Sequence, residues 1–137
     1  MSKKIEKRSD CPVSYVLDFF GDKWTMLIIR DMVFDQKRFY KEFLSSKEGV
    51  ATNILSDRLK RLENIGVIQS SVYEKLRTQK VYTLTEKGKD LIPVLVEMIL
   101  WSAKHGHDMA VTPEFVHKAT HHREEVVAYL LKQLGDD

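Results

Sequence analysis

The sequence contains a single cysteine and no long apolar run. One thiol excludes an intramolecular disulfide framework and is typical of a protein from a reducing compartment. Uninterrupted apolar stretches such as Met26–Ile29 are only a few residues long, whereas a membrane-spanning helix needs about 20. No apolar segment follows the charged start Met1–Lys4, so we expect no signal peptide, no membrane partner and a cytoplasmic location.

The sequence also lacks a large net charge, because 22 basic side chains nearly balance 20 acidic ones and leave +2. The charges are unevenly placed along the chain. Residues 107–137 hold 3 basic and 6 acidic side chains, so residues 1–106 hold the other 19 basic and 14 acidic ones, a balance of +5. A localised basic surface favours a polyanionic partner.

Sequence motifs for enzyme chemistry are missing as well. The chain has no glycine-rich phosphate loop, no Gly-x-Ser-x-Gly turn and no evident acid–base pair, so we expect neither an enzyme nor a cofactor. His117 and His121 have the i, i+4 spacing that can bind a metal, but no acidic residue between them makes a catalytic zinc motif. Surface or packing histidines are the simpler interpretation, and no metal site is predicted.

The hydrophobic periodicity predicts a mainly α protein with one small β-hairpin. Residues 1–9 are polar and basic and are expected to form a mobile tail, residues 10–106 form the main domain, and residues 107–137 form a C-terminal helical extension. The helix in that extension is amphipathic and needs a surface to pack against. Helical patterns cover residues 12–20, 22–34, 38–45, 52–65, 86–105 and 113–134.

Residues 52–65 are predicted to form an amphipathic helix that Gly66 ends. At about 100° per residue, one sector of this helix is apolar and the opposite side carries mostly short hydrogen-bonding groups. The apolar positions are Ile54, Leu55, Leu59, Leu62 and Ile65. The polar positions are Asn53, Ser56, Asp57, Lys60 and Asn64. Periodicity alone favours an ordinary surface helix, but such a polar face is also suited to contacts with base edges.

A β-hairpin is predicted to follow this helix. Residues 67–75 and 80–85 are rich in Val, Tyr, Thr and Ser, and Leu76–Gln79 connect them. The hairpin tip, from Lys75 through Arg77 to Lys80, carries three positive charges and no negative one. Charges at hairpin tips usually serve solubility. A purely basic tip next to a polar-faced helix is less often accidental.

The next helix, residues 86–105, is apolar on more than one face. We expect Thr85 to cap it and Pro93 to bend it. One apolar face would suffice for packing within the domain, so the surplus predicts a second protein surface, most simply the same helix of another copy. The candidate dimer-interface residues are Leu91, Leu95, Met98, Ile99 and Trp101.

Several short segments also match a known family in register. They include Cys11-Pro12-Val13, Gly21-Asp22-Lys23-Trp24, Arg58-Leu59-Lys60-Arg61-Leu62-Glu63, Tyr82-Thr83-Leu84-Thr85 and Pro93-Val94-Leu95. Over about residues 10–106 the chain resembles the HxlR-type bacterial transcriptional regulators. Ala51-Thr52 stands where those regulators often have Ser-Pro, and residues 107–137 extend beyond the usual pattern.

The resemblance implies a winged helix-turn-helix that regulates transcription by binding double-stranded operator DNA as a homodimer, joined through long terminal helices. A helix in the major groove distinguishes base pairs, and a wing beside it contacts phosphate or the minor groove. The candidate recognition-helix residues are Thr52, Asn53, Ser56, Asp57, Lys60 and Arg61. The candidate wing residues are Lys75, Arg77 and Lys80. The alternative is a winged-helix module that binds protein and no nucleic acid.

Arg58 differs from the other basic residues of this segment. Its position lies inside the apolar sector of the helix, where an unpaired guanidinium would be costly. We therefore expect it to pair with an acid on a packed helix, Asp31 or Glu42.

Cys11 has two interpretations. It is either a small, inert residue at a helix start, or a sensor whose thiolate is favoured by the helix N-terminus and by the basic residues before it. Some proteins of the similar family sense oxidants or reactive carbonyls through a cysteine in this motif. An oxidant or a small molecule is accordingly the candidate effector.

Overall fold

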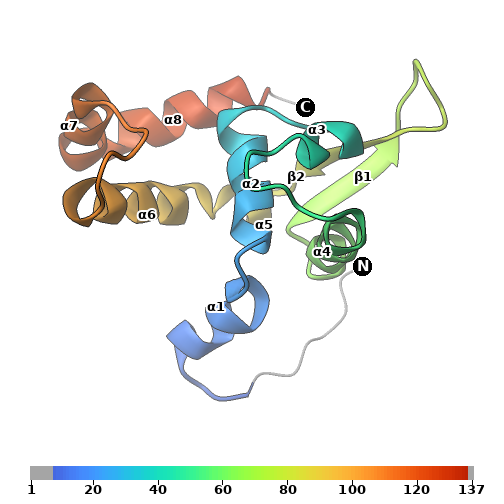
Figure 1. Cartoon of the computed structure of the whole chain (residues 1–137), viewed down its shortest axis with the longest axis horizontal. Helices are drawn as coiled ribbons and strands as arrows, with labels where there is room; N and C mark the ends of the chain where they lie inside the picture. Colours follow the sequence, from blue (N-terminus) through green and yellow to red (C-terminus); the bar gives the residue numbers. More distant parts are fainter. Residues whose placement is uncertain (1–7, 136–137) are drawn as a thin grey trace.

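A computed structural model describes residues 8–135 (Figure 1). It is mainly helical with one antiparallel hairpin, as the sequence predicts. Most of the tail predicted at residues 1–9 lies outside the described residues. In chain order the elements are α1 (Pro12–Phe20), α2 (Thr25–Phe34), α3 (Tyr40–Leu44), α4 (Thr52–Asn64), β1 (Ile68–Val72), β2 (Lys80–Leu84), α5 (Glu86–Lys89), α6 (Ile92–His105), α7 (Pro113–His121) and α8 (Arg123–Gln133).

Helix α2 runs through the centre of the molecule (Figure 1) and supplies the fully buried Ile29 and Val33. It begins at Thr25 rather than at Asp22, where the sequence pattern starts. The Asp22 carboxylate stays outside the helix and accepts hydrogen bonds from the backbone N–H groups of Trp24 and Thr25. A side-chain acceptor in this place satisfies N–H groups that the first turn leaves without partners.

Helices α7 and α8 complete this core. Helix α8 packs against α2 and α6, and α7 packs against α6. Ala119, Val126 and Leu130 belong to the same buried cluster as the α2 side chains. The amphipathic extension therefore packs against α2 and α6 of its own chain. The single helix predicted there is two helices, because His122 leaves helical geometry with a ψ of 49°.

Helix α4 confirms the segment predicted at residues 52–65 to within one residue. Gly66 follows it with a φ of +79°, a conformation that glycine adopts without steric cost. The Gly66 N–H donates to the Glu63 carbonyl, and the Val67 N–H donates to the Leu62 carbonyl. These bonds close the helix and turn the chain into β1. The buried side chains of α4 are Leu55, Leu59 and Leu62.

Strands β1 and β2 pair from Ile68 opposite Leu84 to Val72 opposite Lys80. The predicted first strand, residues 67–75, is too long at its C-terminal end. Past Val72 the Leu76 N–H donates to the Tyr73 carbonyl, and this turn takes residues 73–79 out of the ladder into a loop.

The helix predicted at residues 86–105 is interrupted. Helix α5 ends at Lys89 and α6 begins at Ile92, so the bend expected at Pro93 is a break just before it. Pro93 lies in the first turn of α6, where its missing N–H removes no helical hydrogen bond. Thr85 caps α5 as predicted, since its Oγ1 accepts from the Gly88 N–H at 3.2 Å. Of the helices between residues 8 and 135, none has the length and apolar content to span a bilayer.

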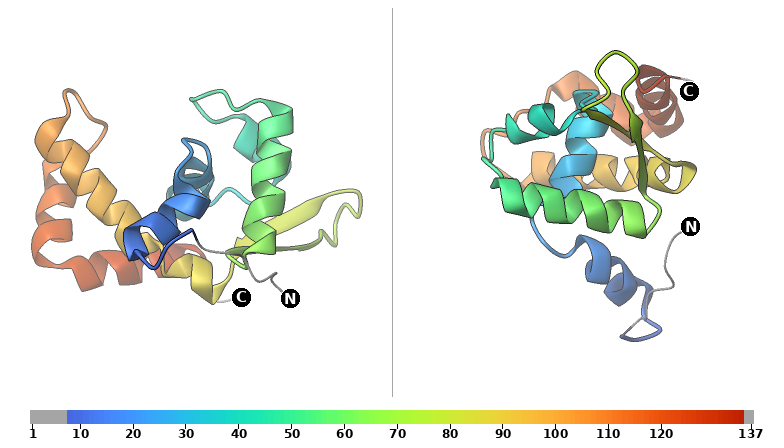
Figure 2. Two further views of the ribbon diagram at one scale, coloured as in Figure 1. Left: turned by 90° about the horizontal axis from the view of Figure 1, so that it is seen from below. Right: turned by 90° about the vertical axis from the view of Figure 1, so that its right-hand side faces the viewer.

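The long axis of the molecule separates two regions (Figure 1). The hairpin and α4 lie at one end, and α7 with the adjoining end of α6 lies at the other. Helix α1 projects away from the rest of the chain in Figure 1 and in the right-hand view of Figure 2, and it has no buried residue.

Candidate nucleic-acid interface

The outer face of α4 is exposed and polar, as the helical periodicity of residues 52–65 predicts. Thr52, Asn53, Ser56, Asp57, Lys60 and Arg61 are all exposed to solvent. They differ in what their side chains already bind. Asn53 and Lys60 make no side-chain hydrogen bond or ion pair with any residue between 8 and 135, so both are available to a ligand.

Ser56 is held by a residue that sequence analysis does not single out. The Tyr40 hydroxyl on α3 donates to the Thr52 carbonyl at 3.0 Å and lies 3.1 Å from Ser56 Oγ. Because this hydroxyl has one proton, Ser56 Oγ is the donor in the second bond. Tyr40 thus fixes the start of α4 against α3, and it leaves Ser56 with acceptor capacity only.

Arg58 pairs with different acids from those predicted. Its Nε donates to Asp22 Oδ2 at 2.9 Å, and its Nη1 bonds to Asp57 on the outer face of α4. The hydrogen bond to Asp22 raises the pKa of Arg58, against the effect of burial. Burial alone would raise the pKa of Asp22, but the hydrogen bonds from Thr25, Arg58 and the Trp24 N–H lower it to about 2. The pair joins α4 to the turn between α1 and α2.

The two acids expected to pair with Arg58 have other partners. The buried Asp31 accepts from Arg30, Lys37 and Ser46. Glu42 caps α3 by accepting from the backbone N–H groups of Arg38 and Phe39 at 2.9 and 3.0 Å. The predicted pairing of Arg58 with Asp31 or Glu42 is therefore wrong. Both carboxylates bind other groups of the chain, and helix periodicity does not reveal such hydrogen bonds.

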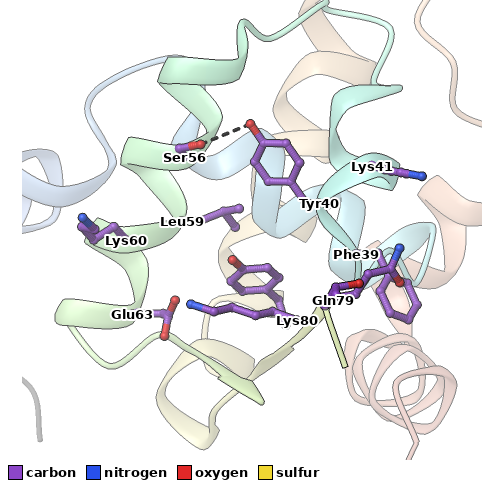
Figure 3. A pocket seen from close by; sticks show the side chains of 11 residues that line it. Phe39, Tyr40, Lys41, Ser56, Leu59, Lys60, Glu63, Gln79 and Lys80 are labelled. Atoms are coloured by element: carbon purple, nitrogen blue, oxygen red, sulfur yellow. Dashed lines mark hydrogen bonds between the residues drawn. The ribbon is translucent and has the colours of Figure 1, made fainter. Parts of the chain in front are cut away.

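A cleft of about 490 Å³ is lined by α3, α4, the hairpin loop and β2 (Figure 3). Its rim carries three lysines from three elements, Lys41 on α3, Lys60 on α4 and Lys80 on β2. Glu63 is the acid among the lining residues, and it accepts a hydrogen bond from Ser70. Lys41 is a candidate contact that sequence analysis missed, since only the fold brings α3 to this rim.

The hairpin loop extends the basic surface. Lys75 and Arg77 are exposed in the loop, and Lys80 is exposed at the start of β2. At the base of the loop, the Tyr73 ring packs edge-on against Phe39, with 4.9 Å between ring centroids. The wing is therefore anchored to the residue that precedes α3.

The order of helices α2, α3 and α4 followed by the β1–β2 hairpin agrees with a family match. The family model described as HxlR-like helix-turn-helix matches residues 19–110. The chain belongs to the HxlR-like helix-turn-helix family.

Relatives and solved structures agree with this membership. The HTH-type transcriptional regulator sll1512 of Synechocystis is 34% identical over 88 residues, which are 64% of each chain. The regulator BH0655 of Halalkalibacterium halodurans is 33% identical over 74% of this chain and 89% of its own length. The redox regulator HypR in its oxidised form matches with a TM-score of 0.61 and 31% identity, over 72% of this chain and all (100%) of HypR. The reduced transcriptional regulator YodB of Bacillus subtilis matches with a TM-score of 0.57 and 30% identity, over 74% of this chain and 99% of YodB.

The apolar surface of this HxlR-like chain is placed differently from the predicted dimer interface. On α6, Trp101 is 68% and Met98 49% exposed, Ile99 is half-buried, and Leu95 is only 5% exposed within the core. Leu91, just before α6, is also half-buried. Leu95 is therefore unavailable to a partner. Helix α1, which sequence analysis did not include, adds further exposed apolar side chains. They are Val13, Tyr15, Val16 and Leu17.

Cys11 is exposed at the N-cap position of α1. Its own N–H donates to Ser9 Oγ, and its carbonyl accepts from the Tyr15 N–H. The thiol is thus at the start of the helix that carries the exposed apolar side chains.

The histidines cluster without forming a three-ligand site. The rings of His117 and His121 lie 4.7 Å apart at their centroids. Among the described residues no group of three or more His, Cys, Asp and Glu side chains has a geometry suited to a metal ion.

Proposed function

We propose that this HxlR-like regulator binds duplex DNA sequence-specifically as a homodimer, with α4 in the major groove and the hairpin on the neighbouring backbone. The observation that carries the proposal is the outer face of α4, where Asn53 and Lys60 are exposed beside a lysine-rimmed cleft and have no side-chain partner among residues 8–135. Such a regulator must share a compartment with the chromosome, so we place it in the cytoplasm.

The side chains of this face divide into two roles. Asn53 has the amide that pairs with the major-groove edge of adenine, and Lys60 can donate to guanine. Thr52, at the N-terminus of α4, and Arg61 are suited to phosphate, as are the wing residues Lys75, Arg77 and Lys80. Asp57 is held by Arg58 and Ser56 by Tyr40, so we assign both a supporting part in base contact.

The homodimer is supported by the exposed apolar side chains of α1 and α6. Trp101 and Met98 together with the α1 residues leave more apolar surface in water than packing within the chain explains. A second copy would cover this surface and present two α4 helices to one duplex, as dimeric helix-turn-helix proteins do.

Selection of bound sequences from random duplex DNA tests the proposal directly. An enriched site with two similar half-sites about one helical turn apart is expected. Affinity for that site should fall steeply as salt rises, because about six phosphate contacts release counterions. No enrichment at any salt, or binding that ignores salt, would instead favour the protein-binding module.

Replacement of Arg77 by Ala separates backbone contacts from base contacts. We expect weaker binding on the selected site and on random DNA alike, and a salt slope reduced by about 1, because Arg77 is assigned to phosphate. Fluorescence anisotropy over a salt series measures both. A loss confined to the selected site contradicts the assignment.

We also propose that Cys11 responds to oxidants or electrophiles. Its exposure at the helix N-terminus supports a reactive thiolate, and the similar chain HypR is a redox regulator. Oxidation of a residue at the start of α1 would act on the same apolar surface that the dimer needs.

A further inference from the structure

A second cavity, of about 300 Å³, shares Phe39 and Tyr82 with the α4 cleft and is formed partly by the C-terminal extension. One wall comes from the end of α2, the segment before α3 and strand β2. The opposite wall comes from the end of α8, with Gln133, Leu134 and Gly135. The family match ends at residue 110, so this wall lies outside the shared domain.

The polar lining of this cavity carries an excess of positive charge. Lys37, Arg38 and Lys89 line it together with one acid, Glu42. Glu42 Oε1 accepts from the N–H groups of Arg38 and Phe39, and its carboxylate offsets one of the three positive charges. Among the described residues that line the cavity, two positive charges are therefore in excess.

The three cations differ in how firmly they are already bound. Lys37 Nζ contacts the buried Asp31 at 3.5 Å. Lys89 pairs at 3.1 Å with Glu86, whose side chain is 91% exposed, and an ion pair with so exposed a partner is weak. The Arg38 guanidinium is on a half-buried residue, yet no hydrogen bond or ion pair joins it to the described part of the chain. Arg38 is the donor most available to a ligand.

The lining also contains apolar side chains. Met32 and Leu84 are buried core residues that reach the cavity, and Phe39 and Leu134 are half-buried beside it. Binding sites for small molecules combine such an apolar lining with a few directed polar groups, and about 300 Å³ is the lower end of their size range.

We propose that this cavity binds a small organic carboxylate whose apolar body lies between Leu84 and Leu134 and whose carboxylate pairs with Arg38. The planar guanidinium matches a carboxylate in two parallel hydrogen bonds, which favours an acid over a neutral ligand of the same shape. Lys89 supplies the second positive charge.

The cavity is connected to the candidate DNA-binding surface through its own lining. The Arg38 carbonyl accepts from the Tyr82 N–H of β2 at 2.8 Å, and the Phe39 ring contacts Tyr73 at the base of the wing. The next residue, Tyr40, holds the start of α4 through Thr52 and Ser56. A ligand that contacts Arg38 and Phe39 therefore changes how the wing and α4 are held. The resulting change in DNA affinity is a regulatory consequence and rests on the proposed function.

The test is a titration of the full chain with 2-naphthoate, followed by ¹H–¹⁵N NMR. Shifts are expected at the backbone amides of Thr83, Leu84 and Gln133, with a dissociation constant of about millimolar. Naphthalene-2-carboxamide, the neutral analogue, and the Arg38→Gln variant should each weaken binding about 10-fold or more. The control variant is Lys132→Gln, which removes a charge from α8 at a residue that does not line the cavity. It should leave binding unchanged.

Three results would overturn the site. They are equal binding of acid and amide, equal binding by Arg38→Gln and the parent chain, and shifts that map to the α4 cleft instead. Because this titration contains no DNA, it does not depend on the proposed function.

A second titration measures affinity for the selected duplex with and without 2-naphthoate. A changed affinity that Arg38→Gln abolishes supports the regulatory consequence, and an unchanged affinity contradicts it. A chain that binds 2-naphthoate at this cavity but never binds DNA contradicts the proposed function and still supports the site.

Discussion

The α4–hairpin end of the molecule exposes lysine, arginine and asparagine side chains, whereas α1 and α6 expose valine, methionine and tryptophan. Each surface includes one helix that also supplies the core, through Leu59 on α4 and Leu95 on α6. In each case the side turned away from the core carries groups that no residue between 8 and 135 pairs with or covers. The first surface suits a polyanion, and the second suits another apolar protein surface.

The two surfaces are joined by the Asp22–Arg58 ion pair. Asp22 lies in the turn after α1, and Arg58 lies on α4 next to Asp57. A change in how α1 packs in the proposed dimer would therefore be transmitted through this ion pair to the candidate recognition helix. The following predictions separate the contributions of each surface and of this link.

The largest effect is expected on the apolar surface. Trp101→Asp should raise the dissociation constant of the proposed dimer at least about 100-fold, because a tryptophan that the second copy would cover is replaced by a charge. Multi-angle light scattering over a concentration series measures it. Tyr129→Asp is the matched control, since this aromatic side chain on α8 is 62% exposed, close to the 68% of Trp101. Equal effects of the two substitutions would exclude α6 as the interface.

The next largest effect concerns the link. The pKa of Asp22 is about 2, below its ordinary value of 3.8, so its ionised form stabilises the folded chain. The contribution is present above about pH 4 and is lost as the pH falls toward 2. Asp22→Asn should therefore reduce the free energy of unfolding by about 2 kcal/mol at pH 7.

Urea denaturation at pH 7 and pH 3 checks this prediction. The difference between Asp22→Asn and the parent chain should shrink at the lower pH, where the parent also loses part of the carboxylate's contribution. A difference that is the same at both pH values would show that packing, rather than charge, makes Asp22 important.

A smaller effect is expected on the polar surface. Asn53→Ala should weaken binding to the selected DNA site about 10-fold and leave binding to random DNA nearly unchanged, because Asn53 is assigned to a base edge. Asn64→Ala is the control, as it makes the same change at the exposed C-terminal end of the same helix. Losses of similar size on both kinds of DNA would assign Asn53 to the backbone.

The smallest effect is expected for Cys11→Ser under reducing conditions, where DNA affinity should not change because the side chain is exposed. Mild oxidation should then alter the affinity of the parent chain and not that of the variant. Anisotropy with and without diamide or hypochlorite tests both statements. If the oxidised parent and the variant bind alike, Cys11 is not a sensor of those oxidants.

The sequence predicted the elements whose patterns are local. The Leu55, Leu59 and Leu62 spacing placed α4 to within one residue, and Gly66 marked its end, because helix periodicity and a left-handed closing residue are properties of neighbouring positions. Family motifs spread over residues 10–106 also predicted the winged helix-turn-helix, because the identity and spacing of motif residues can be compared directly from the sequence.

Only the tertiary structure decided how those elements use their side chains. Arg58 pairs with Asp22 instead of Asp31 or Glu42 because α4 packs beside the α1–α2 turn, and Tyr40 limits Ser56 because α3 packs across the start of α4. Likewise, Leu95 is buried and Trp101 exposed according to where α2 and α8 contact α6. Pairing and burial depend on contacts between segments distant in the chain, and residue spacing along one helix does not contain that information.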